Sequence, residues 1–125
     1  AGQSVDFIEG NYCKLHLLIT SENGSYKEKI KLLYHSGIIE EELFIEDFFF
    51  LGKTSVNQIG IKCTHYHEPD GDRCYYSDIN ESGDKWKVIP VIWHLIVPLD
   101  KNMMLGGIAF YCNPCIHLFA LTLEK

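Results

Sequence analysis

The chain has 125 residues, of which 46% are hydrophobic and 13% aromatic, and its formal net charge is −6 at pH 7. This length and apolar content are typical of one domain with one core, which excludes an intrinsically disordered chain. The acidic balance argues against nucleic acid as a partner, because nucleic-acid binding depends on clustered lysine and arginine. No apolar run reaches the roughly 18 residues of a membrane-spanning helix, so no transmembrane segment is expected. We therefore expect a single domain over residues 1–125.

Cysteines and glycosylation sequons indicate an oxidising compartment. Five cysteines in 125 residues is a high density for a cytosolic protein. Asn-x-Ser sequons begin at Asn23 and Asn80, and both fall in predicted turns where a glycan can be carried. A chain that starts at Ala1-Gly2 without methionine is what removal of a signal peptide leaves, and a cloning scar leaves the same start. We expect a secreted glycoprotein.

Alternating apolar and polar residues predict strands at residues 12–20 and 26–34. The Asn23-Gly24 pair between them tolerates positive φ at both positions, which predicts a tight hairpin turn. The two faces of the first strand carry Cys13, Leu15, Leu17 and Ile19 on one side and Lys14, His16 and Leu18 on the other. In the second strand the face expected to meet solvent carries Lys27, Lys29 and Lys31.

Residues 38–51 are ambiguous between helix and strand, because glutamates that favour a helix precede aromatic residues that favour a strand. We favour a strand over residues 43–50, before a turn at Gly52. Phe48, Phe49 and Phe50 are consecutive, so alternation places at least one ring on the face opposite the others. That ring needs cover from a loop, a ligand or a partner, which makes Phe49 a candidate partner-binding residue.

Residues 60–74, GIKCTHYHEPDGDRC, hold the densest group of side chains that can do chemistry. If residues 56–67 form one strand, side chains two apart share a face. That face would carry Ile59, Ile61, Cys63, His65 and His67, with Tyr66 on the opposite face as a second candidate for partner binding. Residues 69–72 predict a turn, and residues 74–79 a short strand.

The C-terminal third predicts a strand over residues 85–97, apolar on both faces, with Pro90 implying an edge position or a bulge. Residues 103–112 and 115–123 predict a second hairpin around Asn113-Pro114, with a bulge at Gly106-Gly107. The total is about seven or eight strands. We predict an all-β fold, a single-domain antiparallel β-sandwich or partly closed barrel.

The cysteines predict disulfides whose connectivity cannot be deduced from the sequence. Cys63 and Cys74 flank a ten-residue loop that a bridge could close. Cys112 and Cys115 form a C-x-x-C at a predicted hairpin tip, without the helix N-terminus of a redox site or the second C-x-x-C of a zinc ribbon. We expect structural bridging through Cys13, Cys112 and Cys115. One thiol remains odd, which would permit an oligomer through intermolecular pairing.

His65-x-His67 would place two imidazoles on one strand face, as β-barrel metal sites do, and Asp70 or a neighbouring carboxylate could follow from the loop. The arrangement resembles the first motif of the cupin barrels, in which glycine precedes H-x-H and a glutamate follows. Here Glu68 is adjacent to His67, whereas the family places its glutamate three or four residues later. The alternative interpretation is that both histidines are rim residues beside a turn.

A local likeness to the PLAT β-sandwich, a lipid- and partner-binding family, runs from Leu51-Gly52 to Pro90. The family places an LG turn before an I-x-I strand and a later G-K-aromatic run, for which residues 83–90, GDKWKVIP, stand in. The likeness covers about a third of the chain, and the histidine and cysteine content departs from the family.

No G-x-S-x-G elbow, H-E-x-x-H motif or phosphate-binding glycine loop occurs, and a Cys63–His65 pair has no third group to orient it. We therefore expect a secreted binding module, not an enzyme and without a cofactor, that engages a protein or lipid partner through loops and an aromatic or apolar surface. The alternatives are a small cupin-like metal-dependent enzyme using His65 and His67, and a structural subunit of a disulfide-linked assembly.

Overall fold

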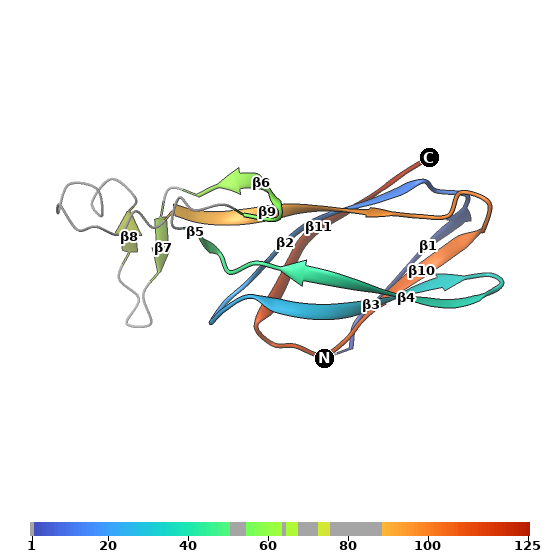
Figure 1. Ribbon diagram of the computed structural model, residues 1–125, viewed down its shortest axis with the longest axis horizontal. Coiled ribbons are helices and arrows are strands. Elements are labelled where there is room, and N and C mark those ends of the chain that lie inside the picture. Colours follow the sequence, from blue (N-terminus) through green and yellow to red (C-terminus); the bar gives the residue numbers. More distant parts are fainter. Residues whose placement is uncertain (1, 51–54, 64, 68–72, 76–88) are drawn as a thin grey trace.

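Two antiparallel β-sheets face each other in the computed structural model, which describes residues 2–50, 55–63, 65–67, 73–75 and 89–125 (Figure 1). All regular elements in these ranges are strands, and the sheets do not close into a barrel. The predicted all-β antiparallel sandwich is confirmed. The strands are β1 (Ser4–Gly10), β2 (Lys14–Ser21), β3 (Tyr26–Tyr34), β4 (Gly37–Ile45), β5 (Phe49–Phe50), β6 (Gln58–Lys62), β7 (His65–His67), β8 (Arg73–Tyr75), β9 (Ile89–Pro98), β10 (Leu105–Phe110) and β11 (Ile116–Glu124).

The first sheet has four strands in the order β1-β10-β3-β4, and the second has five, in the order β11-β2-β9-β5 with β6 also paired to β9. Strands β7 and β8 form a separate antiparallel pair. In the second sheet, β2 lies between β11 and β9, which come from the other end of the chain. The fold is therefore held together by pairings between distant segments.

Strict alternation along β2 and β9 builds the core between the sheets. Leu15, Leu17 and Ile19 on β2 are completely buried, and their neighbours on the opposite face are not. The buried face of β9 includes Trp93, whose indole N–H donates to the Asp47 backbone oxygen at 2.9 Å. The remaining buried apolar residues are Tyr12, Ile30, Leu32, Tyr34, Leu43, Ile45, Val91, Leu95, Val97, Leu105 and Ile108.

Both predicted hairpins are wrong, although their turns are where the sequence placed them. Asn23 and Gly24 adopt positive φ of 61° and 119°, but they join β2 in one sheet to β3 in the other. Residues 111–115 likewise join β10 to β11 across the sandwich. A tight turn reverses the direction of the chain both in a hairpin and in a crossing from one sheet to the other. Which strands then pair is decided by burial between distant segments, which local turn chemistry does not encode.

The observed hairpin joins β3 to β4 through His35-Ser36, with Gly37 at a φ of 151°. Strand β4 covers the first half of residues 38–51, the segment whose pattern is ambiguous between helix and strand. This half is therefore a strand, and it ends at Ile45 and not at Phe50. On its outer face lysines of β3 oppose glutamates of β4, including a Lys29–Glu40 contact of 3.7 Å. The lysine series therefore lies on a solvated, charge-balanced face.

The predicted single strand over residues 56–67 is wrong, because β6 pairs with β9 whereas β7 pairs only with β8. The pairing of β6 shifts register at Gly60, where a Cβ atom would lie 2.7 Å from a methyl of Leu18. The absence of a side chain thus leaves room for the Leu18 side chain, which reaches Gly60 across β9. The predicted bulge in β10 is confirmed, since the register shifts between Leu105 and Gly107.

The expected bridging through Cys13, Cys112 and Cys115 is not found, and these residues and Cys63 carry free thiols. The backbone of Cys13 pairs with Glu124 at one end of β11, and Cys115 pairs with Glu22 at the other end. The eight residues of β2 separate the two ends. At about 3.3 Å per residue they span roughly 25 Å, far beyond the Cα separation of about 7 Å that a disulfide allows. The side chain of Cys74 lies outside those the structure describes.

The core predicts a large effect for Leu17→Ala. Removing a completely buried leucine between the sheets should lower the free energy of unfolding by about 2–5 kcal/mol, measured by urea denaturation. The control is Ile8→Ala on the edge strand β1, where the side chain is 85% exposed and the expected change is below about 0.5 kcal/mol. Equal effects of the two substitutions would contradict the inward orientation of Leu17.

The positions of the cysteines predict that Cys13 never bridges to Cys112 or Cys115 in the folded protein. Mass mapping of a digest prepared without reductant should yield no peptide that joins Cys13 to either residue, because the sheet holds them apart. Detection of such a peptide in folded, monomeric protein would contradict the observed pairing of β2 with β11.

Candidate functional site

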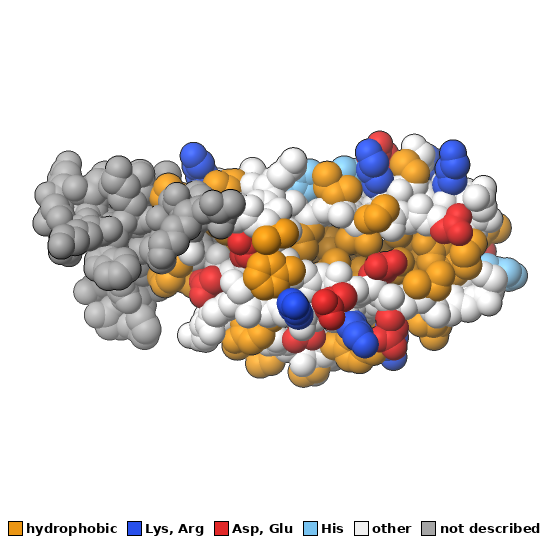
Figure 2. All heavy atoms as spheres, in the orientation of Figure 1, with side chains coloured by type: hydrophobic (Ala, Val, Ile, Leu, Met, Phe, Trp, Pro, Cys, Tyr) orange, Lys and Arg blue, Asp and Glu red, His pale blue; other side chains and the backbone are white. Residues whose placement is uncertain are grey.

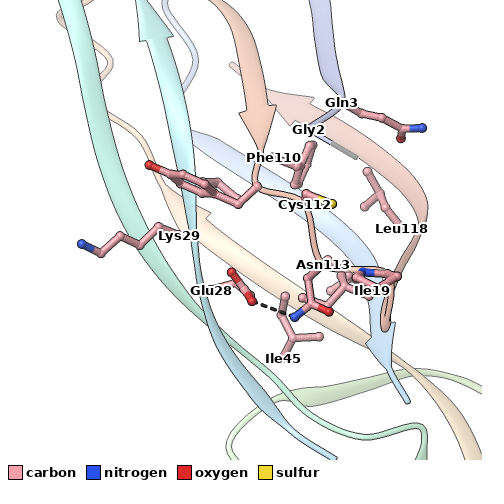
Figure 3. Close-up of a pocket in the computed structure, with 14 residues that line it drawn as sticks. Gly2, Gln3, Ile19, Glu28, Lys29, Ile45, Phe110, Cys112, Asn113 and Leu118 are labelled. Carbon is pink, nitrogen blue, oxygen red and sulfur yellow. Dashed lines mark hydrogen bonds between the residues drawn. The ribbon is translucent and has the colours of Figure 1, made fainter. Parts of the chain in front are cut away.

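A pocket of about 390 Å³ lies where residues 111–115 cross from one sheet to the other; we call it the crossover pocket (Figure 3). Its volume lies within the range of about 300–1,000 Å³ that is typical of small-ligand sites. Ile19, Ile30 and Ile45 of β2, β3 and β4 lie at its base and are at most 2% exposed. The other lining residues are Gly2, Gln3, Glu28, Lys29, Phe110, Tyr111, Cys112, Asn113, Pro114, Ile116 and Leu118.

The crossing segment is fixed in place by the side chain of Asn113. Its amide nitrogen donates to Glu28 Oε1 at 2.7 Å, and its amide oxygen accepts from the Cys115 backbone N–H at 3.0 Å. The second contact is a local turn that Asn favours, while the first ties the turn to β3, the neighbour of β10 in the four-stranded sheet. Figure 3 shows the Glu28–Asn113 hydrogen bond at the pocket. The turn is therefore anchored to the four-stranded sheet beside the pocket.

Glu28 points toward the space between the sheets, because it lies opposite the buried Leu43 in the β3–β4 register. Leu118 enters from β11, where it pairs with the buried Ile19, and it is 37% exposed. The pocket thus has an apolar interior and a few polar groups, which is the usual composition of a site for a small organic ligand.

Tyr26 and Cys115 interact near the same end of the sandwich. A hydrogen bond with the Cys115 thiol raises the pKa of Tyr26, with smaller contributions from burial and from the charges of Asp47 and Glu22. The phenol of Tyr26 is therefore protonated at neutral pH. It is a polar but uncharged group.

A second group of polar side chains lies on the outer face of the five-stranded sheet. His16 of β2 contacts His94 of β9 and Glu124 of β11, so three neighbouring strands contribute one residue each. The hydrogen bond from His16 and the charge of Lys14 lower the pKa of Glu124. The alternation of the sequence predicts that His16 lies on this face. No local pattern predicts its contacts with His94 and Glu124, which are about 80 and 110 positions away in the chain.

The sequence-predicted metal residues are only partly described. His65, Tyr66 and His67 form β7, with His65 opposite Tyr75 and His67 opposite Arg73; Asp70 lies outside the described residues, and so do these side chains. Within the described part of the chain, no group of three or more His, Cys, Asp or Glu side chains is placed to hold a metal ion together. Because the sheets do not close into a barrel, the cupin resemblance is not supported by the fold.

Among the other predicted site residues, Phe49 lies on the short strand β5 and Asn23 lies at a turn. Phe49 is 37% exposed, and its ring centroid lies 4.0 Å from that of Phe48. Phe49 is therefore partly exposed, as expected for one of three consecutive phenylalanines. Partner binding by Phe49 stays a prediction. Asn23 is exposed at its turn, and Asn80 lies outside the described residues. The pocket residues were missed, because they meet only through the crossing of β10 to β11.

The remaining observations concern membranes and relatives. None of the described residues forms a helix that is long and apolar enough to cross a bilayer. Neither the comparison with protein-family models nor the search of curated proteins finds a match to this chain.

Proposed function

We propose that the chain is a secreted, non-enzymatic binding module that holds a small amphipathic ligand of the lipid class in the crossover pocket. The observation that carries this proposal is a pocket between the ends of the two sheets, with core isoleucines at its base and the partly exposed Leu118 on its wall. An acyl chain gains about 0.8 kcal/mol for each methylene that it buries on such a surface. A cavity of this size accepts a short chain or a compact ring system.

The polar groups of the pocket favour a ligand with one polar end. Gln3, Glu28 and Asn113 lie among the lining residues, next to the apolar interior formed by Ile19 and Ile45. Glu28 and Asn113 already satisfy each other by a hydrogen bond. The apolar part of a ligand therefore provides most of the affinity, and its polar head needs only to remain in contact with water.

Binding is favoured over catalysis by the partners of the reactive groups at the pocket. The lining includes the thiol of Cys112 and the carboxylate of Glu28. Glu28 is hydrogen-bonded to Asn113, not to the thiol. A nucleophilic cysteine needs an adjacent base that is itself oriented by a third group. The hydrogen bond between Glu28 and Asn113 supports a structural role for Glu28, as an anchor of the crossing segment, and not a catalytic one.

A protein partner is the second candidate, because apolar side chains are also exposed outside the pocket. Figure 2 shows a band of hydrophobic side chains between two rows of charged ones, along the long axis of the molecule. Ile8, Ile38 and Val56 are among the large apolar residues that are more than 60% exposed. These three residues lie on β1, on β4 and before β6, so the band in Figure 2, and not these residues as one patch, is the surface that would meet a protein or a membrane.

The pocket predicts that Leu118→Trp weakens ligand binding. A tryptophan at this partly exposed lining position occupies part of the cavity, so a fatty acid carrying an environment-sensitive fluorophore should bind at least about 10-fold more weakly, a loss of about 1.4 kcal/mol. Titration of the fluorescence against protein concentration gives the dissociation constant.

The matched control is Phe119→Trp at the adjacent position of β11, where the side chain is 59% exposed and does not line the pocket. It should leave the dissociation constant unchanged. Saturable binding that both variants retain would place the ligand elsewhere. If the wild type binds none of a series of fatty acids of increasing length, the lipid-binding proposal is wrong and the exposed apolar surface becomes the better candidate site.

A further inference from the structure

His16 and His94 form a cross-strand pair on the outer face of the five-stranded sheet. His16 Nδ1 lies 2.9 Å from His94 Nε2, and His16 Nε2 lies 2.7 Å from a carboxylate oxygen of Glu124. The two rings stack at a centroid distance of 5.2 Å with 26° between their planes. Two imidazole nitrogens therefore face each other, and the third group orients one of the rings.

We propose that His16 and His94 bind a divalent transition-metal ion of the copper, nickel and zinc group. Imidazole nitrogen is a preferred ligand of these ions, with metal–nitrogen bonds of about 2.0–2.1 Å for zinc. Two bonds of this length at the right angle of a square-planar copper or nickel site separate their nitrogens by about 2.9 Å, which is the separation observed here; the wider tetrahedral angle of zinc requires the two nitrogens to move slightly apart. When the metal binds, the proton of the His16–His94 hydrogen bond leaves His94 Nε2 and His94 Nδ1 takes up a proton from solvent, so both ligating nitrogens offer a lone pair and both rings stay neutral.

Glu124 acts as a positioning residue for this pair. Donation from His16 Nε2–H to the carboxylate leaves the lone pair of Nδ1 facing His94. A carboxylate that accepts from the remote nitrogen of a histidine ligand is the usual outer-shell partner in zinc sites, since it fixes the tautomer and the ring orientation. His16 is therefore already in the tautomer that can bind a metal through Nδ1.

The strands hold the pair in place and leave it accessible. Leu17 pairs with Leu95 in the register between the two histidine positions, in the centre of the sheet. The side chain of His16 is 25% exposed, so an ion can reach it from solvent. Gln58 of β6 lies opposite His94 in the register and Thr122 of β11 lies opposite His16, so each is a candidate for a further oxygen ligand. Water completes the coordination.

The test is calorimetric titration of the chelator-treated, dialysed protein with NiCl₂ and with ZnCl₂. We expect one ion to bind per chain at this pair. The His94→Gln substitution should weaken the affinity for the ion more than 10-fold. Glutamine can still hydrogen-bond to His16 Nδ1, so this variant retains the packing of the pair while it removes one imidazole ligand. Circular dichroism and the melting temperature establish that the variant is folded.

Two further variants separate this site from other histidines. His117→Ala removes an exposed histidine that pairs with Glu22 at 3.5 Å, and it should leave binding unchanged. A His65→Ala/His67→Ala variant should also retain the ion at His16 and His94. Glu124→Gln should weaken binding about 10-fold, within the range of 10- to 100-fold found for outer-shell partners. Absence of binding, or binding that His94→Gln leaves intact, overturns the proposal.

Discussion

The pairing of β2 with β9 is the constraint on which the rest of the structure depends. It joins segments about 80 residues apart, and it places Leu15, Leu17 and Ile19 beside Val97, Leu95 and Trp93 in the core. The entropy of closing so long a loop is recovered only when this apolar surface is buried against the other sheet. The same register brings His16 next to His94 on the outer face. One pairing therefore provides both the core and the histidine pair.

The crossover pocket has a different origin, in the connections between the sheets. The turn at Asn23-Gly24 and residues 111–115 both pass from one sheet to the other near the same end of the sandwich, where Glu22 N–H donates to the Cys115 oxygen at 2.9 Å. Strands that separate at such an end cannot fill the space between them as completely as they do in the centre. Ile19 and Ile45 then lie at the base of the pocket, still buried. The pocket is thus a consequence of the topology.

Local patterns in the sequence predicted what local physics determines. Alternation identified the buried face of β2, and the paired glycines identified the bulge in β10. Partner choice was not predicted, because a turn such as Asn23-Gly24 is compatible with a hairpin and with a crossing between sheets. The pocket and the His16–His94–Glu124 group both require that choice. Their residues are spread over most of the chain, and no spacing in the sequence indicates that they meet.

Strand β2 contributes to both proposed sites through its two faces. Ile19 faces inward at the crossover pocket, whereas His16 faces outward at the histidine pair. Alternation along a strand separates such side chains by the thickness of the sheet, so neither ligand would contact the other. Any effect of the metal on lipid binding would have to act through the position of β2 itself. Because β2 is hydrogen-bonded on both sides, its freedom to move is small, and the two sites should behave independently.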